Sequence, residues 1–161
     1  MNEREKLRDS YSLAAWIAGF VDGEGTFSVS IFRNRKTSIG WQALPEFLVT
    51  QGQKSIGTLE LMRDYFNCGN IYVNRLRDDH HESAARYCVR RFRELDRIIV
   101  PFFKIHPLRT AKSSDFESFR AIIDLMKNRE HLTLEGLERI AAIGETMNSK
   151  KPSEFLFTMC K

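Results

Sequence analysis

The segment Trp16-Ile-Ala-Gly-Phe-Val-Asp-Gly-Glu-Gly25 joins an apolar run to two acids. The apolar run starts at Ser12 and includes an Ala-Gly pair, and the acids Asp22 and Glu24 flank a glycine at its end. Apolar residues nearly all round predict a short, fully buried helix over residues 12–22, with Ser12 as a suitable N-cap. Its small residues would let a second helix backbone approach closely.

The two acids emerge at the C-terminal end of the predicted helix. The helix dipole already gives that end a partial negative charge, so Asp22 and Glu24 destabilise the helix unless something positive offsets them. A hard divalent cation such as Mg²⁺, held by carboxylates, carbonyls and waters, is the natural candidate. The alternative is a core helix that merely has a polar end.

The chain after this helix changes to strand periodicity. Phe27, Val29 and Ile31 alternate with polar neighbours, which predicts a strand with one core face and one open face. Residues 41–51 predict a second strand, in which Pro45 indicates an edge or a bulge. The later predicted elements are a helix over 55–66, a hairpin of 71–77 and 84–92 around the loop 78–83, and a helix-like run over 95–103.

Helix plus hairpin thus occurs twice, followed by a helix. This weak repeat predicts an α+β fold with a four-stranded antiparallel sheet, helices on one face and the other face open. Two more helices are expected over 113–128 and 133–147, with Ser114 and Thr133 as N-caps. We expect one domain over 1–161, with its core at about 12–128 and a helical extension over 129–161.

The composition suits an intracellular protein with a polyanionic partner. The chain has 161 residues, 42% of them apolar, and a formal charge of +4, although this charge would also suit many ordinary soluble proteins. Three cysteines, Cys68, Cys88 and Cys160, have no close spacing and predict reduced thiols. We expect no signal peptide and no membrane span.

The segment Trp16–Gly25 resembles the motif of the LAGLIDADG homing endonucleases, which has apolar residues, Ala-Gly, an apolar pair, Asp, a small residue, an acid and Gly. The predicted order of elements over 12–128 agrees with that family. The resemblance implies a saddle-shaped αββαββα fold in which two motif helices pack together. One motif per chain then implies a homodimer, whose interface would include Ala15, Trp16, Ala18, Gly19 and Asp22.

The resemblance also implies roles for polar residues. Glu24 would be the metal-binding carboxylate, with the Gly23 carbonyl as a neighbouring ligand for Mg²⁺, or for Mn²⁺ or Ca²⁺ in its place. Gln51 would lie near the scissile phosphates, and Lys54 would contribute charge there. The family also uses a basic residue before the helix that follows the second hairpin; Lys112 fits best, and Lys104 and His106 are competitors.

Alternate residues of the four strands would line the open face and bind DNA. Polar side chains of these types bond to base edges in the major groove, which admits a β-ribbon. The seven arginines between Arg75 and Arg97 strengthen this interpretation, although acids lie among them and a salt-bridged surface is the alternative for any one. The candidates are Thr26, Ser28, Ser30, Phe32, Asn34, Gln42, Glu46, Tyr72, Asn74, Arg86 and Arg90.

The resemblance implies an enzyme that cuts both strands of a long, roughly palindromic double-stranded DNA target and leaves short 3′ overhangs. Two rival hypotheses remain. One is a non-catalytic nucleic-acid binder, such as a maturase that assists intron RNA splicing or a DNA-binding regulator; the other is a small basic interaction module. The sequence does not distinguish a bacterial cytoplasmic source from a mitochondrial or chloroplast one.

Overall fold

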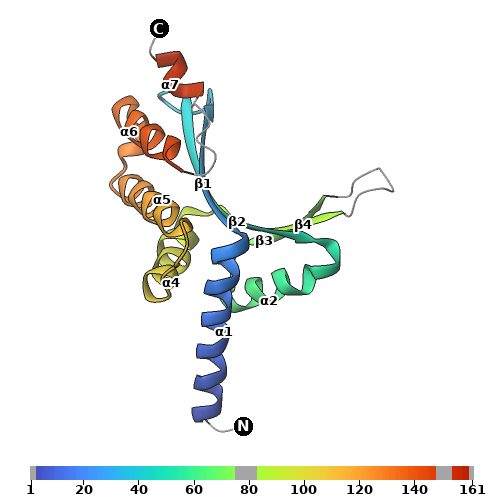
Figure 1. Ribbon diagram of the computed structural model, residues 1–161. Coiled ribbons are helices and arrows are strands. Elements are labelled where there is room, and N and C mark those ends of the chain that lie inside the picture. The colour runs from blue at the N-terminus through green and yellow to red at the C-terminus, as the bar shows by residue number, and fades with distance from the viewer. Residues whose placement is uncertain (1–2, 75–82, 148–153, 160–161) are drawn as a thin grey trace.

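A four-stranded antiparallel sheet has helices packed against one side (Figure 1). The computed structural model describes residues 3–74, 83–147 and 154–159. The order in the sheet is β1-β2-β4-β3. Both hairpins are therefore antiparallel, and the second strand of each lies at the centre. This confirms the predicted α+β class. The strands are β1 (Gly25–Arg33), β2 (Trp41–Gly52), β3 (Asn70–Asn74) and β4 (Ala84–Val89).

Strand alternation gives the sheet two unlike faces. On the helix side, Phe27 of β1 is paired with Phe47 of β2, and both are fully buried. Along each strand, the residues that alternate with these buried ones point to the open side, as a period of two requires. Pro45 pairs with β1 only, because β4 ends at Val89, opposite Phe47. The proline therefore lies where one side of β2 has no neighbouring strand.

The first helix, α1 (Glu3–Glu24), is twice as long as predicted. The expected start at Ser12 is wrong, because the helix continues through it toward the N-terminus. Residues 3–9 are mostly charged helix formers, which have good intrinsic propensity and no apolar stripe, so hydrophobic periodicity does not detect them. Figure 1 shows the N-terminal half of α1 extending beyond the other elements.

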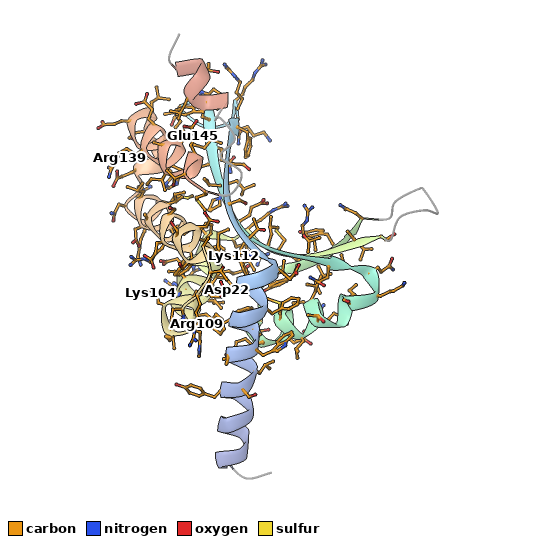
Figure 2. All side chains as sticks on the ribbon, in the orientation of Figure 1. Asp22, Lys104, Arg109, Lys112, Arg139 and Glu145 are labelled. Carbon is orange, nitrogen blue, oxygen red and sulfur yellow. The ribbon has the colours of Figure 1, made fainter. Side chains whose placement is uncertain are left out.

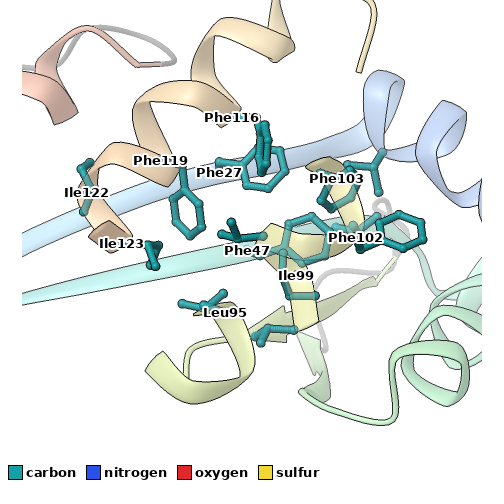
Figure 3. Close-up of a cluster of buried hydrophobic side chains, with 14 of the residues drawn as sticks. Phe27, Phe47, Leu95, Ile99, Phe102, Phe103, Phe116, Phe119, Ile122 and Ile123 are labelled. Carbon is teal, nitrogen blue, oxygen red and sulfur yellow. The ribbon is translucent and has the colours of Figure 1, made fainter. Parts of the chain in front are cut away.

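Aromatic side chains join the sheet to the helices (Figure 3). The Phe27 ring stacks on Phe47 with centroids 5.2 Å apart, and it meets Phe103, Phe116 and Phe119 at 5.3–5.4 Å. Fully burying one such side chain contributes about 1.5–3 kcal/mol. The cluster therefore fixes the strands against the helices and, through Phe27, the start of β1 at the end of α1.

The later helices broadly follow the predictions. The expected N-cap at Ser114 is wrong, because α5 already begins at Lys112; the Thr133 cap is confirmed, and its hydroxyl accepts a 3.0 Å bond from the Gly136 amide. The predicted loop 78–83 lies almost wholly outside the described residues.

The helices after α1 are α2 (Ile56–Phe66), α3 (Phe92–Glu94), α4 (Val100–Ile105), α5 (Lys112–Lys127), α6 (Leu134–Glu145) and α7 (Glu154–Met159). Short helical segments lie beside them: η1 (Gln53–Ser55), η2 (Leu95–Ile99) and η3 (Glu130–Leu132).

The C-terminal helices contribute to the same hydrophobic cluster as the sheet. Leu137 of α6 and Phe155 of α7 are fully buried, and the Phe155 ring packs edge-on against Trp41 with centroids 5.0 Å apart. Cys68 and Cys88 are buried free thiols, as expected, whereas Cys160 lies outside the described residues. Within the described ranges, no helix is long and apolar enough to cross a membrane.

Candidate active site at the end of the first helix

Glu24 is the last residue of α1, and β1 begins immediately after it at Gly25. The helix passes into the strand without a connecting loop, which requires the backbone to fold closely over Val21. A Cβ at Gly25 would lie 2.5 Å from Val21 Cγ1 and 2.8 Å from the Val21 carbonyl oxygen. Only glycine fits this junction. The Glu24 side chain, one residue earlier, is exposed.

Gln51 lies beside Glu24, and its Nε2 donates a 3.2 Å hydrogen bond to Glu24 Oε2. The strand register explains this approach: Gly25 pairs with Val49, so Gln51 near the end of β2 extends past the start of β1 to the helix end. Lys54 lies three residues further on, in η1, with an exposed side chain. The structure thus brings Gln51 to the Glu24 carboxylate.

Asp22 binds the loop that precedes α5. Its carboxylate accepts hydrogen bonds from the amides of Arg109, at 2.9 Å, and Thr110, at 3.1 Å, and from the Thr110 hydroxyl at 2.6 Å. Burial acts to raise the pKa of Asp22, but these bonds and the nearby Lys112 outweigh it, so the pKa is lowered. Amides and a hydroxyl therefore offset the charge of Asp22 at the helix end. The sequence had predicted a metal ion in this role.

Lys112, the first residue of α5, reaches back to the same helix end. Its Nζ donates to the Gly23 carbonyl oxygen at 3.1 Å and also to that of Gly25. Burial lowers the pKa of Lys112, and the carboxylates of Asp22, Glu24 and Asp115 oppose that effect. An ammonium group is thus held next to Glu24.

The two competitors for the basic position lie elsewhere. Lys104 is exposed near the end of α4, and His106 packs against Phe102, with ring centroids 4.8 Å apart. Figure 2 shows Asp22 and Lys112 together where α1 meets the sheet. Of the three candidates, Lys112 contacts the motif backbone.

Two residues of this site were not predicted. Arg109 and Thr110 donate hydrogen bonds to Asp22, although they lie 87 and 88 positions further along the chain. Arg109 contributes its backbone amide, which every residue except proline carries, so its side chain gives no signal. A threonine two residues before a candidate lysine is the only local hint, and it is a weak one.

The open face carries the side chains predicted to bind DNA. Thr26, Ser28, Ser30 and Phe32 alternate along β1 away from the helix side, opposite Leu48, Glu46, Leu44 and Gln42 of β2 in register. On the same face of the second hairpin, Arg86 of β4 pairs with Tyr72 of β3, and Ala84 pairs with Asn74. The predicted residues of the four strands therefore share one surface.

Two details of this face differ from the simple alternation. β1 ends at Arg33, so Asn34 lies in the turn rather than on the strand as expected; its side chain donates to Gln42 Oε1 and accepts from the Lys36 amide. Arg90 forms an ion pair with Glu46, and its guanidinium lies 5.9 Å from the Tyr72 ring centre. A salt-bridged arginine, the alternative considered above, is thus present at this position.

The exposed side of α1 carries small residues. Ala15, Gly19 and Gly23 are exposed, and Trp16 keeps 43% of its surface open. Ala18 is largely buried. A Cβ at Gly19 or Gly23 would meet no atom within 4 Å, so the described part of this chain does not itself require glycine at either position.

The donor set at the helix end suits a hard cation but is incomplete. Glu24 offers a carboxylate and Gly23 a carbonyl, both oxygen ligands of the kind that Mg²⁺ and Ca²⁺ prefer. The described residues contain no group of three His, Cys, Asp or Glu side chains able to hold a metal ion. A cation at Glu24 would therefore need further oxygens from water, a second chain or a phosphate.

Comparisons with known proteins agree with this geometry. Residues 17–123 match the family model described as "LAGLIDADG endonuclease", which spans the motif, the sheet and most of α5. The chain belongs to the LAGLIDADG endonuclease family. It is 33% identical over 135 residues to "Probable intron-encoded endonuclease 3" of Neurospora crassa, covering 83% of this chain and 24% of that protein. The chain thus spans about a quarter of the length of such curated relatives.

Solved structures of homing endonucleases have the same fold. The crystal structure of I-TnaI superposes with a TM-score of 0.79 and 39% identity, covering 91% of this chain and 95% of that one. I-SmaMI, bound to an uncleaved DNA target in the presence of calcium ions, superposes with a TM-score of 0.82 and 30% identity, covering 92% of this chain and 49% of that one. This chain therefore matches about half the length of I-SmaMI.

Proposed function

We propose that the protein is a site-specific DNA endonuclease that works as a homodimer with a divalent cation and hydrolyses both strands of a long, roughly palindromic duplex. The observation that carries the proposal is the convergence of Glu24, Gln51 and Lys112 at the end of α1. A protein that only bound nucleic acid would have no need of a carboxylate beside the phosphates. The nucleases and DNA-bound structures among its relatives support the same function.

Each residue of this site has a role that follows from its contacts. Gln51 orients the Glu24 carboxylate through its amide nitrogen. Lys112 holds the carbonyls of the motif backbone and places positive charge where a phosphate would approach. Asp22 fixes the loop at Thr110, and thereby the start of α5 and the Lys112 side chain. Asp22 is in this scheme a positioning residue.

Glu24 and the Gly23 carbonyl would hold the cation. A carbonyl oxygen has two lone pairs, so Gly23 can accept from Lys112 and keep one for a further partner. A bound Mg²⁺ supplies Lewis-acid stabilisation of the phosphate and lowers the pKa of a coordinated water. The chain's own contribution is to hold the Lys112 ammonium on the carbonyls of Gly23 and Gly25, the two residues that flank Glu24.

A second copy supplies the second site. Glycine within a helix costs about 0.5–1 kcal/mol relative to alanine, yet the described chain does not use the space at Gly19 or Gly23. Close approach of another α1 backbone accounts for both glycines and places two Glu24 side chains near one two-fold axis. The match to about half of I-SmaMI is the length expected if one copy corresponds to one half.

The open face of the sheet is the DNA-binding surface in this proposal. Its two-stranded ribbons have the width that a major groove admits, and Arg86, Arg90 and the amides and hydroxyls around them suit base edges and phosphates. Binding and cleavage then reside in different residues. This separation provides the test.

The test of the function is Glu24→Gln, which removes a charged ligand while leaving size and the sheet unchanged. We expect double-strand cleavage to fall on the order of a thousandfold, whereas affinity for the same duplex changes less than about threefold. The matched control is Glu60→Gln, at an exposed position on α2. Unchanged cleavage by Glu24→Gln would refute the site. Tight binding without cleavage by the parent protein would favour a maturase or a regulator.

A further inference from the structure

A groove runs beside the exposed face of α1, between this helix and the chain that leaves α4. It has a volume of about 280 Å³, and its walls include Ala15, Ala18 and Gly19 on one side and Ile105, His106 and Pro107 on the other. Ile105 is 69% exposed, so an apolar side chain is left open to water at its edge. The groove is therefore open along α1 and apolar at its alanines, Ile105 and Pro107, while Asp22, His106 and Arg109 add polar groups to its lining.

Trp16 lies on the opposite flank of the same helix. It is 43% exposed, and its ring stacks on Phe20 with centroids 5.1 Å apart and planes 14° from parallel, which fixes its orientation. At 3.6 residues per turn, Trp16 projects about 60° to one side of Gly19, whereas Ala15 and Asp22 project about 40–60° to the other. The Tyr11 ring agrees with this geometry, since it meets His106 on the groove side, with centroids 6.0 Å apart.

We propose that the groove receives the Trp16 indole of a second copy of this chain, while the groove of that copy receives Trp16 of the first. The inference rests on the proposed pairing of α1 helices. A two-fold axis parallel to α1 brings the Trp16 flank of one helix against the groove flank of the other. The two contacts are then identical and flank the close approach at Gly19.

The chemistry of the groove fits this occupant. An indole would cover the exposed Ile105 and the methyl groups of the two alanines with a flat apolar surface. Arg109 also lines the groove, and its guanidinium can lie against the face of an indole ring. Tryptophans that enter apolar pockets at an interface dominate its binding energy. Trp16→Ala should therefore raise the dissociation constant of the dimer about thirtyfold.

Cross-linking between two differently labelled copies tests the contact. One copy carries Trp16→Cys and the other, labelled with ¹⁵N, carries Ile105→Cys, both with Cys160→Ser so that the remaining cysteines are buried. After the copies are mixed with a short bismaleimide, we expect a cross-link from position 16 to position 105 that joins a labelled to an unlabelled chain. Neither variant alone should form a cross-linked dimer.

The outcomes separate this inference from the proposed function. If sedimentation shows a dimer but positions 16 and 105 do not join, or position 16 joins position 16, the groove contact is wrong and the homodimer stands. If no dimer forms even on target DNA, both are wrong. As a second readout, Trp16→Ala should weaken the dimer whereas Leu134→Ala, at a similarly exposed apolar residue on α6, should not. Equal effects would also overturn the contact.

Discussion

The end of α1 and the open face of the sheet hold their polar residues in different ways. At the helix end, Glu24 contacts Gln51 and Asp22 contacts Thr110, just before α5, so the partners come from two distant segments of the chain. On the sheet, strand alternation decides which face a residue lies on, and side-chain contacts such as Arg90–Glu46 and Asn34–Gln42 join positions close to each other in the sheet. The first region is a network that ties the helix end to distant segments, and the second is a surface built by strand register. Changes at the helix end should therefore affect cleavage, and changes on the sheet should affect binding.

Lys112→Met gives the largest effect expected after Glu24→Gln. The variant keeps the length of the side chain but removes the ammonium that contacts the Gly23 carbonyl. We expect cleavage at saturating enzyme to fall about a hundredfold, as for loss of one charge-stabilising donor, with affinity nearly unchanged. Single-turnover kinetics measure both. Lys104→Met is the control, and an equal loss in that variant would return the basic role to Lys104.

Thr110→Val tests whether Asp22 acts through the loop. The change removes the 2.6 Å hydroxyl bond to Asp22 at nearly constant volume, and a charge-assisted bond of this kind contributes about 1.5–3 kcal/mol. If that free energy fixes Lys112, cleavage should fall about twentyfold. Thr110→Ser should restore most of the rate because it keeps the hydroxyl. A purely structural role would instead lower the melting temperature and leave the rate of the folded enzyme unchanged.

Arg86→Ala gives the smallest effect and should appear in binding only. Arg86 is exposed at the middle of a cross-strand row on the open face. We expect affinity to fall about fivefold and, if Arg86 neutralises a phosphate, the slope of log K against log salt to decrease by about 0.9. Cleavage at saturating enzyme should not change. Arg139→Ala on α6 is the control (Figure 2), and an unchanged salt slope would remove Arg86 from the phosphate contacts.

The sequence predicted most of the fold because apolar periodicity carries that information. The alternation of Phe27, Val29 and Ile31 predicted which face of β1 is buried, and the repeat of helix plus hairpin predicted the sheet. It placed the start of α1 wrongly, since the charged residues 3–9 have helix propensity but no apolar stripe. It also placed Asn34 on a strand, where the hairpin turn has already begun.

The candidate site was only partly predictable. Glu24, Gln51 and Lys112 were named from the motif and from its resemblance to a family, and the structure brings them together. The contact of Asp22 with the Arg109 and Thr110 amides depends on how α4 turns into α5, which no local pattern reports. Dipole reasoning correctly required a partner for the acids, but for Asp22 that partner is the protein's own backbone.

The most direct test is cleavage of a duplex that spans the site, in an intron-free copy of the host gene, where an intron encoding this protein would be inserted. The reaction is run with Mg²⁺ and with EDTA, and the ends formed on each strand are resolved. We expect cuts on both strands that require the metal and leave 3′ overhangs. Cleavage that continues in EDTA, or nicking of one strand only by the folded dimer, would contradict the assignment of a metal-dependent site to each Glu24.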